Sequence, residues 1–200
     1  MPTNTSATGG YLVPEADPLV LEGQALRRFL HGVVVGVTAL SDELVRQQWQ
    51  PNPPPIPGID VDWCAFGITD QRRDFDPFFD QQDTGGTLMR RHEECDILCI
   101  FYGPNCQSYA NRLADGLYVA QNRDAMSSVG MGLIGFSDVV HVPELINERW
   151  FDRADVTWSI RREIVREYPV LHFLGADGEI AANRAETTII KDWEVPVQGE

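Results

Sequence analysis

With 200 residues and 43% apolar composition, the chain can bury one substantial core, and its length favours a single domain over two compact ones. Its 30 acidic and 16 basic residues leave a formal net charge of -14, which excludes the strongly basic class of nucleic-acid binders. The polar first ten residues lack the order of a secretory signal and no apolar run could cross a bilayer, so we expect cytoplasmic synthesis and no membrane partner.

A polar lead-in and a helix are expected first along the chain. Residues 1–16 are rich in Thr, Ser, Gly and Pro without periodicity, which predicts a flexible N-terminal arm. Asp17 followed by Pro18 is typical of a helix start. Apolar residues then recur at spacings of three and four as far as Val37, so the helix should lie on the core.

Two strands flank a proline-rich connection in the next part of the sequence. Residues 43–49 and 61–69 both favour strands, and the second is apolar on both faces, as a central strand would be. Five prolines between positions 51 and 57 predict an extended loop of polyproline character. The loop therefore separates two strands rather than two domains.

Residues 70–87 are charged and glycine-rich and predict an inserted loop or hairpin within the domain. Phe78 and Phe79 stand there among aspartates, where no local core would bury them. Exposed aromatic residues of this kind favour a docking element, so both are candidates for a subunit interface.

The stretch 92–102 alternates as a strand does, with Cys95, Ile97, Cys99 and Phe101 on one face. His92, Glu94 and Asp96 fall on the other face and Glu93 on the first, and we interpret these acidic residues as a solvated strand start rather than a metal or acid–base site. A helix follows residue 105. A second short helix is predicted to be capped by Asn122 and ended by Gly130.

The longest predicted strand runs from Trp150 to Glu163, after a glycine-interrupted strand at 131–140. Unbroken, it would reach about 45 Å at ~3.3 Å per residue, longer than one compact domain requires, so part of it should project into a neighbour. One face is polar and alternates in charge. This face is either an ordinary solvated surface or one that pairs with a second copy, and its interface candidates are Arg153, Asp155, Arg161 and Glu163. Trp150, which the alternation places on the opposite face, is a further interface candidate at the start of the strand.

The predicted organisation is an α+β domain with a mainly antiparallel sheet packed against two or three helices, and with extended arms. Residues 17–169 form the domain and 170–200 a C-terminal arm that binds another subunit, with Trp193 as an interface candidate because the tail offers it no core.

Catalytic and ligand-binding motifs are missing from the sequence. No nucleophile elbow, zinc-binding helix, phosphate-binding loop or dinucleotide fingerprint is present, so we expect no catalytic residues, no cofactor and no metal. The spacing of the cysteines predicts reduced core thiols rather than a disulfide framework or a zinc site: Cys64, Cys95, Cys99 and Cys106.

Several stretches resemble the phage neck-terminator family, whose members are often prophage-encoded. They are Arg28–Val34 (RFLHGVV), Trp63–Ile68 (WCAFGI), Phe101–Asn105 (FYGPN), Asp115–Arg123 (DGLYVAQNR) and Val142–Leu145 (VPEL). The likeness covers about residues 20–168, so both arms, and also the inserted loop at 70–87, are expected to fall outside it. These motifs are structural rather than catalytic.

The resemblance implies a structural virion protein without enzymatic activity. Such a subunit would form a homohexameric ring in the neck, cap the tail tube and join it to the head–tail connector or adaptor. DNA would pass through a central channel without sequence-specific binding, and the sheath is a further candidate partner. Rival interpretations are a tail-completion or head–tail adaptor subunit at another neck position, and a cytoplasmic hydrolase that uses a cysteine or a carboxylate.

Overall fold

The computed structural model describes residues 4–15, 21–81, 86–170, 175–184 and 187–196, and it gives residue 81 and the last two stretches through their backbone alone. The described chain has a mixed sheet of many strands and three α-helices, which confirms the predicted α+β class. It divides into two compact units. The main unit comprises Leu19–Pro77 and Arg91–Ile164, and the hairpin unit comprises Met1–Pro18, Phe78–Arg90 and Val165–Glu200.

The central sheet has the strand order β1-β2-β4-β9-β5. Its strands are β1 (Val45–Gln47), β2 (Trp63–Arg73), β4 (Thr87–Tyr102), β9 (Arg153–Tyr168) and β5 (Met131–Phe136). β1 runs parallel to β2, while the pairs β2–β4 and β5–β9 are antiparallel. The short β6 (Val140–His141) also pairs with β9, so the sheet is mainly antiparallel, as predicted.

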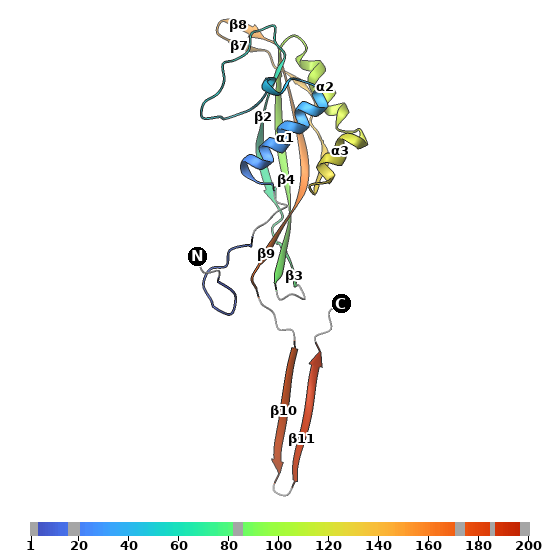
Figure 1. Cartoon of the computed structure of the whole chain (residues 1–200). Helices are drawn as coiled ribbons and strands as arrows, with labels where there is room; N and C mark the ends of the chain where they lie inside the picture. Colours follow the sequence, from blue (N-terminus) through green and yellow to red (C-terminus); the bar gives the residue numbers. More distant parts are fainter. Residues whose placement is uncertain (1–3, 16–20, 82–85, 171–174, 185–186, 197–200) are drawn as a thin grey trace. The chain divides into compact units, whose positions relative to one another are not determined.

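Three helices cover one face of the sheet in the main unit: α1 (Gly23–Thr38), α2 (Cys106–Gly116) and α3 (Ala120–Ser127) (Figure 1). Each presents an apolar stripe to the sheet, which buries the large side chains of the core. Leu30 and Leu113 of the helices are fully buried with Phe66 and Trp158 of the strands. Alternation therefore places every second residue of β2, β4 and β9 in this core.

The first helix begins later than the sequence predicts. Asp17 and Pro18 lie outside the described residues, residues 21 and 22 are not helical, and α1 starts at Gly23. The carbonyl of Leu21 accepts a hydrogen bond from Arg162 on β9, which anchors this residue to the sheet. Gly23 then turns the chain with a φ of 53°, a conformation that glycine adopts easily.

The predicted helix cap at Asn122 is wrong. α3 begins at Ala120, so Asn122 lies inside the helix. Its side-chain Nδ2 donates a hydrogen bond of 2.8 Å to the carbonyl of Gly116, at the end of α2. The residue thus closes the carboxyl end of one helix rather than the amino end of the next.

The predicted strand from Trp150 to Glu163 is interrupted at Asp152, where the carbonyl accepts a bond from the Gly103 amide at 3.1 Å. Before the break, β8 (Arg149–Phe151) pairs with β7 (Glu144–Ile146) and with no other described strand. The two strands are joined by a two-residue turn of positive φ at Asn147 and Glu148. Unbroken alternation would place Trp150 on the same buried face as Ala154, but across the break Phe151 is buried and Trp150 is exposed. From Ala154 onward the predicted alternation is confirmed.

A second apolar cluster lies on the sheet face opposite the helices. It comprises Trp63, Ile100, Tyr102 and Phe151, and the Trp63 and Tyr102 rings stack at 4.4 Å between centroids. On β4 the adjacent residue Phe101 belongs to the helical core, so successive residues of this strand serve the two clusters. β8 therefore covers one end of an otherwise polar sheet face.

The described part of the hairpin unit includes two antiparallel strand pairs. β3 (Phe78–Gln81) pairs with the first residues of β4, so the predicted loop or hairpin at residues 70–87 contains this strand. β10 (Gly175–Arg184) and β11 (Thr187–Pro196) pair along their whole length and with no other described strand. The N-terminal residues 4–15 are tied to this unit by amide hydrogen bonds from Ser6 to Pro169 and from Glu15 to Glu167.

No helix in the described part of the chain is long and apolar enough to cross a membrane.

Candidate interaction surfaces

Arg153 and Asp155, two of the predicted interface residues, pair with each other in the same chain. Arg153 contacts the carboxylate of Asp155 at 2.7 and 2.6 Å and that of Glu144 at 2.8 Å. The hydrogen bonds to Asp155 raise the pKa of Arg153 above its ordinary value. Burial, and then donation to Glu144 at 2.9 Å, raise the pKa of Tyr102. This cluster joins β9 to β7 and β4, so its charges are satisfied before any partner arrives.

Arg161 lies farther along the same face of β9 and contacts Glu94 at 3.3 Å and Asp74 at 3.4 Å. Glu163, two residues on, is exposed on the same strand face. These are solvent-exposed ion pairs across neighbouring strands, and each contributes only about 0–1 kcal/mol. They order the surface more than they stabilise the fold.

The polar sheet face carries an excess of negative charge. Its ion-paired arginines are Arg72, Arg153 and Arg161, and the carboxylates that they contact are Asp70, Asp74, Glu94, Asp96, Glu144 and Asp155. Coulombic attraction to Asp96 raises the pKa of Arg72. The pairs therefore form a fixed pattern of charge that remains net acidic.

The prediction of a solvated acidic strand start is wrong for Glu93, which is only 1% exposed. Its carboxylate accepts hydrogen bonds from Arg162 at 2.6 and 2.8 Å, from Arg73 at 3.0 Å and from Gln71. Burial by itself raises the pKa of Glu93, but the hydrogen bonds from Gln71 and Arg162 outweigh it and leave the pKa below its usual value. The alternation had placed Glu93 on the core face, but nothing in the sequence identified its partner sixty-nine positions away.

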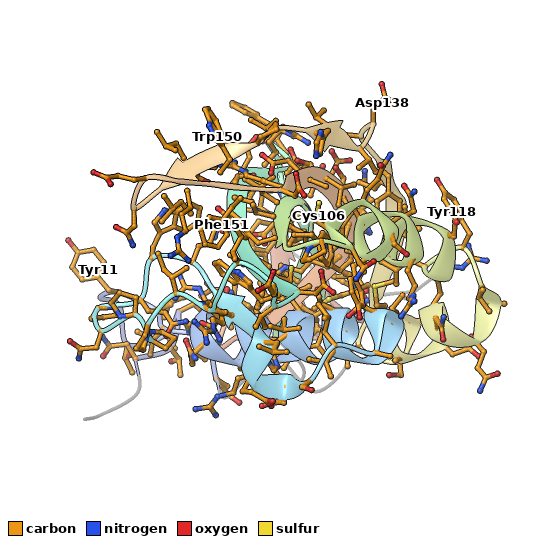
Figure 2. The ribbon with its side chains drawn as sticks, turned by 90° about the horizontal axis from the view of Figure 1, so that it is seen from above. Tyr11, Cys106, Tyr118, Asp138, Trp150 and Phe151 are labelled. Atoms are coloured by element: carbon orange, nitrogen blue, oxygen red, sulfur yellow. The ribbon has the colours of Figure 1, made fainter. Side chains whose placement is uncertain are left out.

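Trp150 stands with Leu145 as an exposed cross-strand pair on the β7–β8 hairpin. Trp150 is 66% exposed and Leu145 56% exposed. Figure 2 shows Trp150 pointing outward from β8 while Phe151 turns toward the interior. Large aromatic side chains dominate the binding energy of protein interfaces, so this pair can serve as an anchor for a partner. The sequence identified Trp150, but Leu145 became visible only with the register of the hairpin.

The remaining interface candidates belong to the hairpin unit. Phe78 and Phe79 are both exposed and follow one another on β3, so they face opposite sides of the ribbon. Trp193 is described through its backbone alone, which pairs with Gly178 in the β10–β11 register. The structure thus places the eight predicted residues on four different strands, and it joins two of them, Arg153 and Asp155, by hydrogen bonds.

The four cysteines are buried and unpaired by disulfides: Cys64, Cys95, Cys99 and Cys106. Burial raises the pKa of Cys95 to about 12 and also raises the pKa of Cys64 and of Cys106. A thiol of raised pKa stays protonated near neutral pH and is a poor nucleophile. Among the described residues no group of three or more His, Cys, Asp or Glu side chains could hold a metal ion.

These surfaces define a structural class of protein, one whose apolar anchors and ordered charges are suited to contact with other macromolecules. The chain belongs to the phage neck terminator protein family, whose model matches residues 24–184. The family is one of structural virion proteins of the phage neck, so the protein has a structural role in that part of the particle. The match also covers residues 70–87 and the whole of β10, which corrects the expectation that both regions fall outside the family. No curated protein sequence matches the chain.

Proposed function

We propose that the chain assembles into a homohexameric ring that caps the tail tube and joins it to the head–tail connector or adaptor, with the sheath as a further candidate partner. The family provides the place of the protein in the phage neck. Ring formation needs two different surfaces on each subunit that meet in a head-to-tail manner. Trp150 with Leu145 on one unit and the β10–β11 hairpin on the other are suitable elements for these surfaces.

The β10–β11 hairpin is the observation that carries the proposal. It pairs ten residues of β10 with ten of β11, and its outer edges pair with no other strand among the described residues. A two-stranded hairpin alone is marginally stable in water, and open strand edges readily pair with another chain. A segment of this length therefore gains stability if it packs against a neighbouring subunit or the tail tube.

The charge of the protein suits a wall beside DNA. The chain carries a formal net charge of -14, and carboxylates outnumber arginines on the polar sheet face. A surface of like charge forms no counterion-releasing contacts with phosphate, so DNA would pass without being held.

Native mass spectrometry and negative-stain imaging of the full chain test the proposal. We expect a six-subunit ring with a central channel, and we expect loss of the ring when residues 171–200 are deleted. A matched control deletes residues 1–3 only, which leaves the hairpin intact. A full-length chain that stays monomeric both alone and with the tail tube protein would contradict ring formation. Undisturbed rings after the deletion would contradict the role of the hairpin.

A further inference from the structure

A cleft of about 330 Å³ in the main unit has the features of a binding site. Its walls come from the end of β1, the proline-rich loop and strands β2 and β4. Trp63 and Tyr102 are stacked side chains of the lining, while Trp49 and Ile56 are exposed apolar residues that also line it. Aromatic and proline-rich linings of this kind typically receive extended peptide segments.

Two buried polar atoms of the cleft residues lack a hydrogen-bond partner. They are Oε1 of Gln48, an acceptor, and Nε1 of Trp63, a donor on a side chain that is 8% exposed. Buried polar groups without a partner are rare because they lose their hydrogen bonds to water. A peptide unit carries one donor and one acceptor, so a bound main chain could satisfy both atoms if the side chains that cover them turn aside on binding.

The backbone at Trp49 is held in an uncommon conformation beside this cleft. Trp49 has a φ of 55°, and its ring lies so close to Gly67 that a Cβ there would come within 2.6 Å of Cζ3. Strained residues of this kind persist where the surrounding structure fixes them and are concentrated at binding sites. The glycine therefore allows the exposed indole to form part of the cleft.

Addition of a strand to the edge of β1 is a poor alternative mode of binding. The carbonyl of Val45 is within 3.0 Å of Nε2 of His31, and the carbonyl of Gln47 accepts a hydrogen bond of 2.7 Å from Gln50. Side chains thus already occupy main-chain acceptors of this short strand. Recognition in the cleft must then rely on its apolar walls and on the two unpaired polar atoms.

The N-terminal loop has the chemistry that such a cleft would accept. Tyr11 is 95% exposed (Figure 2). Val13, two residues further along in the same stretch without helix or strand, is 59% exposed. Leu12 and Val13 form no backbone hydrogen bond among the described residues, although the loop is anchored on either side at Ser6 and Glu15. An anchored loop loses little further conformational entropy when it binds.

Charge also favours this loop as the occupant. Glu15 follows the apolar residues of the loop, and Arg46 contributes a guanidinium group to the lining of the cleft. Arg46 already lies 5.6 Å from the centre of the Trp63 ring and donates to the carbonyl of Pro55 at 2.6 Å, so it is held in place. An acidic residue beside an apolar segment complements a fixed cation beside an apolar cleft.

We infer that the Tyr11–Val13 segment of one subunit binds in the Trp49–Trp63 cleft of a second copy of the chain. This inference rests on the proposed ring and specifies one of its subunit contacts. The main-chain groups of the segment would bond to Gln48 and Trp63, Tyr11 and Val13 would contact the aromatic wall, and Glu15 would approach Arg46. The contact is heterologous, since a loop of one copy meets a cleft of the next.

Cysteine cross-linking between two singly substituted chains tests the contact. Tyr11→Cys and Ile56→Cys are co-expressed and oxidised, and the products are separated without reductant while ring formation is followed by native mass spectrometry. Because the four natural cysteines are buried, the introduced thiols are the reactive ones. We expect a covalent heterodimer from this pair and none from a control pair of Tyr11→Cys with Tyr118→Cys. Rings that form without the heterodimer would overturn the inference alone, and monomers under all conditions would overturn the ring as well.

Gln48→Met separates binding from folding, because it keeps the length of the side chain and removes the unpaired acceptor. We expect the urea midpoint of the subunit to stay equal or rise, while ring dissociation becomes about 3- to 10-fold more favourable, the worth of one hydrogen bond. Unchanged ring dissociation would show that Gln48 contacts no incoming segment and would count against the inference.

Discussion

The buried ion pair between Glu93 and Arg162 gives the most demanding test of the fold. Arg162 supplies two of the hydrogen bonds to Glu93 and also donates one to the Leu21 carbonyl, and residues Glu93 and Arg162 are 1% and 3% exposed. Arg162→Met keeps an apolar stem of similar length but leaves the carboxylate with only Arg73, Gln71 and the Cys95 thiol. Removal of one partner from a buried pair typically costs about 3–5 kcal/mol.

The expected loss for Arg162→Met at pH 7 is therefore about 3 kcal/mol, at the lower end of that range because Arg73 and Gln71 still satisfy part of the carboxylate. Domains of this size unfold with about 5–15 kcal/mol, so the variant should retain a folded state with a clearly lowered midpoint. Urea denaturation followed by tryptophan fluorescence measures the difference. The double variant Glu93→Leu with Arg162→Met removes both charges and should recover much of the loss.

The dependence on pH has opposite signs in the two proteins. In the wild type the pKa of Glu93 lies below its unfolded value, so its contribution is present above that unfolded pKa and is lost as the pH falls through the folded pKa. In Arg162→Met the main counter-charge of Glu93 is gone, and burial should raise the pKa of its carboxyl group. Protonation of Glu93 as the pH falls then removes the buried unpaired charge and reduces the destabilisation of the variant. The stability gap between the proteins should therefore narrow at acid pH. A loss below about 1 kcal/mol, or a gap that widens on acidification, would refute this reasoning.

Three further outcomes follow from the described residues. Trp150→Ala should change the unfolding free energy of the subunit by no more than about 0.5 kcal/mol but weaken ring assembly by about 2 kcal/mol, as measured by dilution in native mass spectrometry. Tyr118 is comparably exposed, and Tyr118→Ala should change neither quantity. A ring of unchanged stability in Trp150→Ala would show that Trp150 is not part of the interface. Gly116→Ala should lower the unfolding free energy by about 1–3 kcal/mol, because the added Cβ would collide with Cγ1 of Val37 where α2 approaches α1. Adding Val37→Ala to this variant should restore the lost stability, and failure of this rescue would contradict the contact. The four cysteines should react with a thiol reagent only at the rate of unfolding, and fast labelling of the folded chain would show that one of them is accessible.

Strong periodicity made much of the fold predictable from the sequence. The alternation of Cys95, Ile97, Cys99 and Phe101 correctly predicts the buried face of β4, and the apolar spacing that runs as far as Val37 correctly places α1 on the core, where Leu30 and Val34 are fully buried. These patterns arise because one face of each element must leave water, so each can be detected from residues close together in the chain.

Structural features that depend on hydrogen bonds between residues far apart in the sequence could not be predicted from local patterns. The interruption at Asp152 depends on a hydrogen bond from Gly103, and the delayed start of α1 depends on a bond between Arg162 and Leu21. The same holds for the candidate surfaces. Trp150 could be proposed as an exposed aromatic residue, but its pairing with Leu145 and the cleft around Trp63 required the register of the strands.

The burial of the four cysteine sulfur atoms has a consequence for the chemical stability of the phage particle. A phage is assembled in a reducing cytoplasm and then released into an oxidising medium, where accessible thiols would cross-link or oxidise over time. All four sulfurs of this chain sit inside the core, with Cys64, Cys95 and Cys99 on adjacent strands and Cys106 on the covering helix. The subunit should thus keep the same covalent structure before and after lysis, and its neck should need no antioxidant protection during storage in air.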